Sequence, residues 1–465
     1  MRVLQDVLPT AEQLTIIRSN RPGYFIVRGA AGSGKTTSAL LRLRYLSHAW
    51  IARRERLGLD EPVKILVLTF NRTLRGYIQE LARETVEDVD GLNLTISTFA
   101  KWSKRLTLTG DVLQDRARRD KICTLGAALK LNDNFLCDEV DYALGRFLPE
   151  DLDNYLTKRR VGRGASPRIN RRRLIEEVLQ PYLAWKAQEG LPDWNDIAVE
   201  LSRSRVGRGY DVVVADEVQD FSANQLRAVN SQMADGNFSV TLVLDQVQQI
   251  YARGFTWQEV GIPINAARDT VRLSQNYRNT VEIAQFASSI LAGVDVSEEG
   301  TIPDFSRCIK SGRKPIVLRG KFEPQLAYAI NYIKKHVDGA KESVAFLHPK
   351  GWFNFVKDGL GAANLEWVEI TRDSEWPQGD EFIALSTMHS AKGLEFDHVF
   401  LLGLNEQVTR EHGDEAEDTQ LETLRKLLAM AVGRAKKSVI LGYKPGEESV
   451  LLQYLDADTY KAVDL

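Results

Sequence analysis

The sequence predicts an α/β protein built from two parallel-sheet lobes, with a helical insertion in the first lobe. Short apolar runs alternate with helical periodicity up to about residue 102, and the alternation resumes near residue 206. Between residues 103 and 205 the apolar runs disappear and arginine is frequent. A second alternating series follows. We therefore assign residues 1–102 and 206–275 to the first lobe, 103–205 to the insertion and 276–465 to the second lobe.

The strands are predicted where short continuous apolar runs occur, as in parallel sheets that are covered on both faces. In the first lobe these runs are residues 24–28, 63–68, 92–98, 211–216, 239–245 and 271–278. In the second lobe they are residues 315–318, 343–347, 366–370, 382–386, 398–402 and 438–442. Before the first run, Thr10 and Gln13 have the spacing of a capping box, which predicts a short helix.

The composition predicts a soluble protein of a reducing compartment. Hydrophobic residues make up 43% of the chain, charged residues 27%, and the net charge is −2. Because the net charge is small, binding to nucleic acid would have to rest on local basic patches. The three cysteines are scattered, which predicts neither a disulfide framework nor a zinc site. No pattern of a signal peptide or membrane span is visible, so we expect a cytoplasmic protein.

The clearest motif is a glycine-rich loop between a predicted strand and a predicted helix. Its residues match G-x-x-x-x-G-K-[ST] and are Gly29, Ala30, Ala31, Gly32, Ser33, Gly34, Lys35 and Thr36. Such glycines let backbone N–H groups surround phosphate oxygens, and the helix N-terminus adds positive partial charge. We expect Lys35 to reach the β- and γ-phosphates of a nucleoside triphosphate and Thr36 to hold Mg²⁺.

Two adjacent acids, Asp216 and Glu217, follow another apolar run, which is the position where open parallel sheets bind ligands. In a chain with a phosphate loop, Asp216 is expected to order Mg²⁺ as Thr36 does. Glu217 is expected to be the general base toward the attacking water. The alternative is an acid-rich surface turn, and the apolar residues 212–215 argue against it.

The order of the motifs resembles that of superfamily 1A helicases of the UvrD/Rep/PcrA type, over most of the chain. Residues 216–220 are similar to D-E-x-Q-D, and residues 244–251 resemble G-D-x-x-Q-S-I-Y. Residues 276–278 match N-Y-R. Residues 387–396 closely copy T-x-H-x-x-K-G-L-E-F, and residues 427–435 resemble L-L-Y-V-A-x-T-R-A. The resemblance implies two RecA-like lobes that bind ATP between them.

The resemblance also implies contacts to the base and sugar of the nucleotide. Gln13 would read the adenine, and Tyr277 would lie against it. Glu395 would contact the sugar. Thr37, at the end of the phosphate loop, stands where arginine is common in the family. This departure removes no chemical group from the assigned roles.

At the γ-phosphate, the resemblance implies Gln248 as a sensor, Arg278 as a contact and Arg434 as the arginine finger. We expect these arginines to come from the second lobe or the border between the lobes, so that loss of the γ-phosphate would open the cleft. In phosphoryl-transfer enzymes an arginine finger is worth roughly 10³–10⁵ in rate.

Contacts to nucleic acid are predicted from aromatic and basic residues. Phe70 and Phe99 follow strand ends, where aromatic residues of the family help to form the single-strand track; Phe99 could equally be an ordinary core aromatic. Trp257 could replace the stacking aromatic of the family, although the register is shifted. His389 could contact the strand, couple it to the ATP site, or be a buried structural residue. The basic cluster at residues 158–173 suits a phosphate-contacting loop or a solvated face.

The resemblance thus implies an ATP-dependent DNA helicase or translocase that moves 3′→5′ on single-stranded or partly duplex DNA. Only about a hundred residues separate the N-Y-R and K-G-L-E-F motifs, little more than the second lobe itself needs, so we expect the family's large second-lobe insertion to be absent or vestigial. An alternative is a DNA-sensing ATPase that regulates a partner nuclease, because the chain also resembles the helicase-like subunit of Gabija anti-phage systems in size. RNA as the track stays open.

Overall fold

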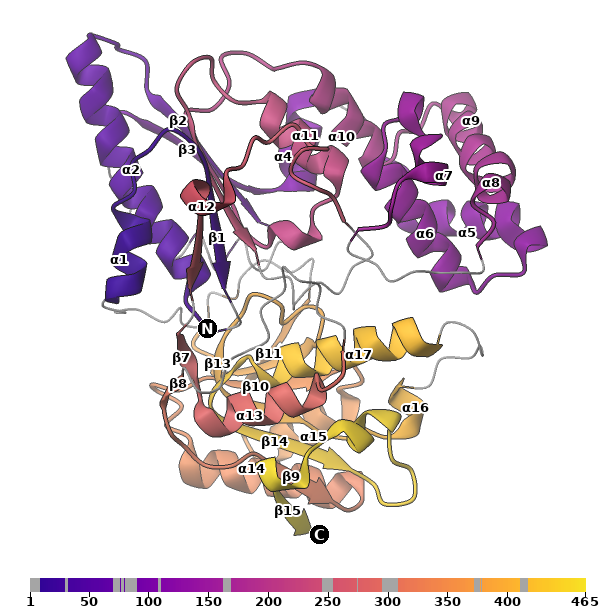
Figure 1. Cartoon of the computed structure of the whole chain (residues 1–465). Helices are drawn as coiled ribbons and strands as arrows, with labels where there is room; N and C mark the ends of the chain where they lie inside the picture. The colour runs from indigo at the N-terminus through magenta and orange to yellow at the C-terminus, as the bar shows by residue number, and fades with distance from the viewer. Residues whose placement is uncertain are drawn as a thin grey trace.

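The computed structural model divides the chain into two α/β lobes and a helical insertion (Figure 1). It describes residues 9–29, 32–69, 76, 79, 90–107, 110–161, 169–244, 254–273, 275–294, 308–371, 377, 379–409 and 417–465. The first lobe and the insertion lie side by side above the second lobe in this view, and the chain ends at the bottom of the second lobe. Among the described residues, no helix is long and apolar enough to cross a membrane.

The first lobe contains a six-stranded parallel sheet with the order β3-β2-β4-β5-β1-β6. Its strands are β1 (Gly23–Gly29), β2 (Val63–Thr69), β3 (Leu92–Thr98), β4 (Val212–Ala215), β5 (Ser239–Leu244) and β6 (Thr270–Leu273). Its helices are α1 (Ala11–Ile17), α2 (Lys35–Leu57), α4 (Phe99–Thr107), α11 (Ala223–Ser231), α12 (Ala266–Asp269) and the short η4 (Val218–Asp220). Successive residues of a strand point to opposite faces of the sheet. Val213 packs into the hydrophobic core on one face, and Val214 packs into the core on the other face. Burial on both faces explains the continuous apolar runs.

The insertion is a small helical body with its own core. It contains α5 (Asp115–Gly126), η1 (Ala127–Leu129), α6 (Asp133–Arg146), η2 (Pro149–Asp151), α7 (Asn154–Thr157), α8 (Arg171–Leu174), η3 (Ile175–Leu179), α9 (Gln180–Glu189) and α10 (Trp194–Arg203). Val140 and Val178 are fully buried in this core. In contrast, Ala198 and Leu201 of α10 pack into the core of the first lobe. Helix α10 therefore anchors the insertion to that lobe.

The second lobe contains a seven-stranded parallel sheet with the order β11-β12-β10-β13-β14-β9-β15. Its strands are β9 (Ile316–Arg319), β10 (Val344–His348), β11 (Trp367–Ile370), β12 (Ile383–Thr387), β13 (Phe396–Leu401), β14 (Ala435–Tyr443) and β15 (Lys461–Asp464). Its helices are α13 (Val281–Ile290), α14 (Phe322–His336), α15 (Asn354–Ala362), α16 (Glu406–Thr409), α17 (Glu417–Val432), η7 (Val450–Tyr454) and η8 (Ala457–Thr459). Helices α13 and α17 cover one face, and α14 and α15 cover the other.

The predicted α/β class is confirmed, and the predicted strands are found with small shifts at their ends. The prediction of a single strand over residues 271–278 was wrong. Strand β6 ends at Leu273, and β7 (Asn276–Thr280) pairs with β8 (Cys308–Lys310) in a separate two-stranded ribbon. Strand β15 was missed because it lies at an edge and is mostly exposed, so it has no apolar run. In the described part of residues 281–392, we find only elements of the second lobe and of this ribbon.

Candidate active site

The phosphate loop connects β1 to α2, as predicted, and two of its glycines take backbone conformations that other residues disfavour. Gly32 has φ +83° and Gly34 has φ +76°. A side chain at Gly32 would collide with the amide of Asn276, and one at Gly34 with the amide of Gln13. The loop is thus held between α1 and the N-Y-R segment. Ala30 and Ala31 lie outside the described residues.

Lys35 and Thr36 begin α2 and already have partners inside the first lobe. The Nζ atom of Lys35 donates to the carbonyl oxygen of Gly29 at 2.6 Å. The hydroxyl of Thr36 donates to Oδ2 of Asp216 at 2.7 Å. Burial, together with the charge of Glu217, raises the pKa of Asp216 to about 7. A hydroxyl and a buried carboxylate in contact are oxygen donors of the kind that Mg²⁺ prefers.

Glu217 directly follows Asp216 and has a left-handed backbone with φ +54°. Such a conformation is costly for a residue other than glycine and is concentrated at functional sites. Its backbone N–H donates to Oδ1 of Asp216 at 2.9 Å, and the amide of Gln219 donates to its carboxylate. Burial raises the pKa of Glu217, but the positive charges of Lys392 and Arg434 outweigh that effect and hold it below its ordinary value. Glu217 is therefore an anion that can accept a proton.

The second lobe reaches this acidic cluster through Lys392. The Lys392 side chain is 2% exposed, and its Nζ atom lies 2.6 Å from Oδ2 of Asp220 and 3.8 Å from Oε2 of Glu217. Asp220 is fully buried. Both Asp220 and Lys392 belong to motifs visible in the sequence, yet sequence reasoning gave neither a role. The spacing of residues within each motif does not indicate that the side chains of Asp220 and Lys392 are in contact.

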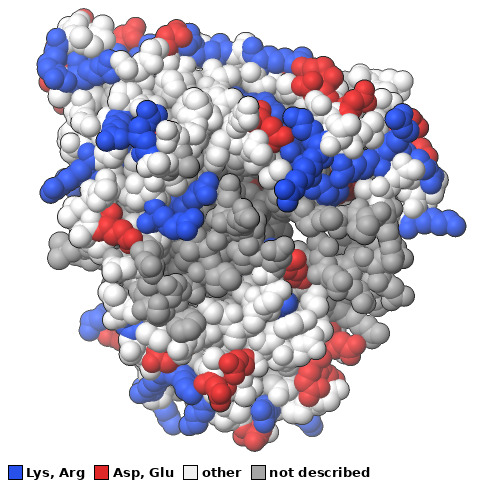
Figure 2. All heavy atoms as spheres, viewed as in Figure 1, with Lys and Arg blue, Asp and Glu red and all other residues white. Residues whose placement is uncertain are grey.

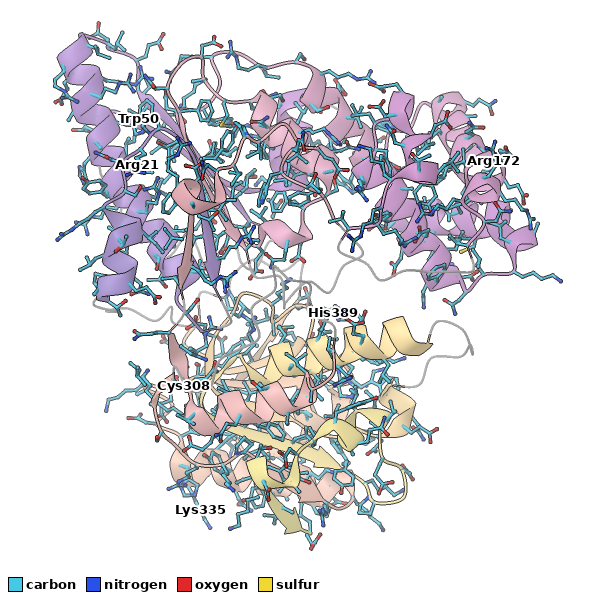
Figure 3. All side chains as sticks on the ribbon, viewed as in Figure 1. Arg21, Trp50, Arg172, Cys308, Lys335 and His389 are labelled. Atoms are coloured by element: carbon cyan, nitrogen blue, oxygen red, sulfur yellow. The ribbon has the colours of Figure 1, made fainter. Side chains whose placement is uncertain are left out.

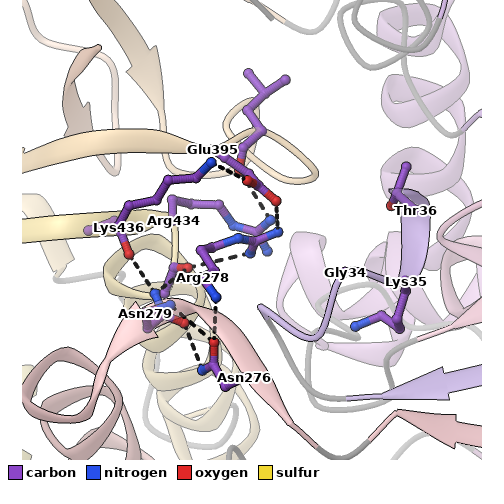
Figure 4. Close-up of polar contacts among 12 residues, drawn as sticks. Gly34, Lys35, Thr36, Asn276, Arg278, Asn279, Glu395, Arg434 and Lys436 are labelled. Atoms are coloured by element: carbon purple, nitrogen blue, oxygen red, sulfur yellow. Dashed lines mark hydrogen bonds and ion pairs between the residues drawn. The ribbon is translucent and has the colours of Figure 1, made fainter. Parts of the chain in front are cut away.

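The two predicted arginines lie together on the side of the second lobe, across from Lys35 (Figure 4). Arg278 forms an ion pair with Glu395, which also binds Nζ of Lys436 at 2.9 Å. Burial raises the pKa of Glu395, but these two cations hold it well below its usual range. Arg434 is 1% exposed, and its guanidinium donates to the carbonyl oxygen of Leu394 at 3.4 Å.

The backbone of the N-Y-R segment touches the phosphate loop even though the Arg278 side chain turns away from it. The backbone N–H of Arg278 donates to the carbonyl oxygen of Gly32 at 3.2 Å. Asn279 ties the same segment to the second lobe, because its amide donates to the carbonyl oxygens of Gly433 and Ala435 at 3.1 and 2.5 Å. The short strand β7 therefore contacts both the phosphate loop and the residues that follow α17.

Comparison with known proteins decides the family. The UvrD/REP helicase N-terminal domain profile matches residues 10–257, more than half of the chain. The chain belongs to the UvrD/Rep helicase family. The UvrD-like helicase C-terminal domain profile matches residues 365–445 in the second lobe of this UvrD/Rep-type chain. The resemblance inferred from the motifs is therefore confirmed.

Three similar proteins illustrate the relationship. A probable DNA helicase of Mycoplasma pneumoniae is 23% identical over 449 residues, which are 90% of this chain and 80% of that protein. The ATP-dependent DNA helicase PcrA of Bacillus subtilis is 36% identical over 73 residues, 16% of this chain and 10% of that protein. A solved C-terminal domain of a possible DNA helicase from Lactobacillus plantarum matches with 21% identity and a TM-score of 0.30, covering 40% of this chain and 98% of that domain.

The nucleotide-side residues that the UvrD/Rep resemblance assigned are partly described. Gln13 is 2% exposed and forms the predicted capping box with Thr10: the Thr10 N–H donates to Oε1 of Gln13 at 3.0 Å. Ser33 is buried beside Gly29, and Thr37 is half-buried in the first turn of α2. Gln248 and the side chain of Tyr277 lie outside the described residues.

The predicted nucleic-acid contacts have mixed outcomes. Phe99 is 5% exposed and packs edge-on against Trp102 and Phe221, so in this conformation it is a core aromatic and cannot stack on a base. Trp257 is half-buried, with its ring edge-on to Phe255 at 5.2 Å. His389 lies at the border of the two lobes (Figure 3). Phe70 lies outside the described residues.

Three described arginines of the basic cluster at residues 158–173 are engaged within the insertion. Arg160 forms a buried ion pair with Glu139, and Arg171 donates to the carbonyl oxygen of Tyr155 at 2.9 Å. Arg173 pairs with Glu177 on the helix surface at 2.6 Å. These contacts favour structural roles for the three arginines. Residues 162–168 lie outside the described residues.

Proposed function

We propose that this chain is an ATP-dependent DNA helicase or translocase that uses Mg²⁺·ATP to move 3′→5′ along single-stranded DNA. Membership of the UvrD/Rep family supports the reaction class, and the 3′→5′ direction follows from the resemblance of the motifs. Lys and Arg side chains gather over the first lobe and the insertion on the face in Figure 2, which suits a phosphate backbone.

The observation that carries the proposal is the contact of Lys392 with the acids of the first lobe. Lys392 comes from the second lobe, and its ammonium group lies 2.6 Å from Asp220 and 3.8 Å from Glu217. A nucleotide that changes the charge beside Glu217 therefore changes the strength of the Lys392 contact, which joins the second lobe to the first. Such a contact is suited to convert hydrolysis into relative motion of the lobes.

The segment between β12 and β13 could couple DNA binding to nucleotide binding, because it extends from one edge of the second-lobe sheet to the other. Because the two strands are parallel, the segment must run from the carboxyl edge of the sheet back to its amino edge. His389 stands near its start, Lys392 follows, and Glu395 stands at its end beside Arg278. DNA at the first edge and nucleotide at the second would act on the same eight residues of chain, Met388 to Glu395.

Hydrolysis is assigned to the groups around Asp216. Thr36 and Asp216 are the residues that would hold Mg²⁺, which when bound neutralises phosphate charge. Lys35 would leave the Gly29 carbonyl for the β- and γ-phosphates. Glu217 would take a proton from the water that attacks the γ-phosphorus as the bond to ADP breaks.

For the arginines to complete this site, their present contacts must be exchanged. Arg278 would leave Glu395, and Arg434 would leave the carbonyl of Leu394, to reach the γ-phosphate. These exchanges would draw the second lobe toward the phosphate loop. Product release would reverse them, so each ATP would drive one closing and opening of the cleft.

A second candidate is a DNA-sensing ATPase that regulates a partner nuclease. The described part of residues 281–392 holds only the second lobe and its ribbon, without a further helical subdomain. Two lobes without such a subdomain are as compatible with a DNA-sensing ATPase as with an enzyme that unwinds DNA. Co-purification with a nuclease from the native host would favour this candidate.

ATPase stimulation by nucleic acid tests the proposed function. We expect single-stranded DNA to raise the ATP turnover of the wild-type protein well above its DNA-free rate, because DNA at the carboxyl edge of the second lobe would bias Lys392 and the arginines toward the closed site. Matched RNA and blunt duplex DNA of equal length serve as comparisons, and Lys35→Ala as the background. An ATP turnover that single-stranded DNA leaves unchanged would contradict the proposal.

A further inference from the structure

A short loop that is hydrogen-bonded to His348 follows β10 in the second lobe. His348 ends the strand and is 7% exposed. Its Nδ1 atom accepts hydrogen bonds from the backbone N–H groups of Lys350 at 3.1 Å and Trp352 at 3.2 Å. Burial, helped by the charge of Lys350, lowers the pKa of His348 to about 4, so the ring remains a neutral acceptor at neutral pH. The imidazole thus ties the backbone of Lys350 and Trp352 to the end of β10.

This loop and the first turn of α15 each expose a large aromatic ring to solvent. Trp352 is 58% exposed, with its ring 5.7 Å from that of His348 and tilted by 31°. Phe355, at the start of α15, is 76% exposed and lies 6.3 Å from the ring of Phe322. Large aromatic side chains are more often covered, so two rings this exposed within one short stretch of chain make the stretch a candidate binding surface. Here the surface is also preorganised, which lowers the entropic cost of binding.

The loop lies beside the segment that links the two lobes. Strands β10 and β12 are paired in parallel with His348 opposite Thr387, so both chains leave the sheet at its carboxyl edge. A side chain at Gly351 would lie 3.1 Å from Cγ2 of Thr387, which shows that the loop packs on this residue. His389 follows two residues later, at the border of the lobes (Figure 3). Trp352 therefore shares an edge with His389.

We propose that Trp352, positioned by His348, is a base-stacking platform for single-stranded nucleic acid on the second lobe. This inference rests on the proposed function and adds to it a residue that lies outside the motifs quoted above. A nucleobase offers a flat face to an aromatic ring whatever its sequence. Lys350 and Lys321, which flank the aromatic residues, are exposed and supply positive charge for the neighbouring phosphates. Exposed aromatic rings next to lysines match the bases and phosphates of single-stranded nucleic acid better than they match the apolar surface of a partner protein.

The test compares oligo(dT) with an abasic oligonucleotide of the same length. Fluorescence anisotropy measures the affinity of each for the wild-type protein and for Trp352→Ala. We expect Trp352→Ala to weaken oligo(dT) binding by about 5- to 150-fold and to leave abasic binding nearly unchanged, because only stacking is lost. The salt dependence of binding should stay the same, because no phosphate contact is removed.

Two further variants control for folding and for general loss of surface area. Trp352→Phe keeps a stacking ring and should retain most of the affinity, whereas Tyr45→Ala removes a 39% exposed ring from α2 and should change nothing. The DNA-free ATPase of Trp352→Ala should equal that of the wild type. An equal loss of affinity for both oligonucleotides, or no loss of affinity for oligo(dT), would overturn the inference. Either result would instead favour a protein partner at this surface. If DNA stimulates the wild type in either case, the proposed function survives; if the wild type binds no strand, both fail.

Discussion

Replacing Glu217 with Gln is expected to lower ATP turnover by about 10²- to 10⁴-fold, because the residue assigned as general base can no longer accept a proton. ATP binding should persist, since Lys35, Thr36 and Asp216 are untouched. The substitution keeps the size of the side chain, although it removes the charge that faces Lys392. Steady-state phosphate release and equilibrium binding of a fluorescent ATP analogue measure the two properties separately.

Glu177→Gln is the matched control for this variant. Glu177 lies on the insertion in an exposed ion pair with Arg173, far in sequence from the phosphate loop, and its loss should leave turnover unchanged. If Glu217→Gln hydrolysed ATP at the wild-type rate, another group would have to activate the water. If it lost ATP binding as well, the acid would be structural.

Replacing Lys392 with Met is expected to destabilise the protein by about 3–5 kcal/mol near neutral pH, because it removes the ammonium group that lies 2.6 Å from the buried carboxylate of Asp220. The two side chains are 2% and 0% exposed, so water cannot replace the lost partner. Chemical unfolding followed by tryptophan fluorescence measures the effect. DNA stimulation of ATP turnover should fall in the same variant, because the contact between the lobes is lost.

The double variant Lys392→Met with Asp220→Asn separates the two effects. Removing both charges leaves no buried carboxylate that has lost the Lys392 ammonium group, so much of the lost stability should return, whereas DNA stimulation should not. Lys437→Met, at a half-exposed lysine paired with Glu342, is the matched control and should cost far less. A Lys392→Met protein as stable as the wild type would show that Asp220 is well accommodated without Lys392.

The parts of the fold and site that depend on local sequence could be predicted. The parallel strands were visible because burial on both faces makes each a continuous apolar run. The phosphate loop was visible because Gly32 and Gly34 need positive φ angles that few other residues take. Thr36 and Asp216 were each assigned to Mg²⁺ from their motifs, and the structure places the Thr36 hydroxyl 2.7 Å from Oδ2 of Asp216 although 180 residues separate them.

The parts that depend on packing between distant segments could not be predicted. Lys392 and Asp220 are 172 residues apart, and nothing in either motif says that one neutralises the other. Arg278 and Glu395, 117 residues apart, were both assigned to the nucleotide, yet here they bind each other. The burial of Phe99 is set by Phe221 of another segment, so its position after a strand end could not distinguish a track residue from a core one.

Displacement of streptavidin from biotinylated single-stranded DNA tests the central claim most directly, because it requires ATP-driven movement in one direction. The account predicts that the wild-type protein with Mg²⁺·ATP displaces streptavidin from a 5′-biotinylated strand much faster than from a 3′-biotinylated one, since a 3′→5′ motor runs into the 5′ end. Glu217→Gln should displace it from neither strand. Equal, ATP-independent rates at both ends, in a protein whose ATPase is stimulated by DNA, would contradict the claim of a motor and favour a DNA-sensing ATPase.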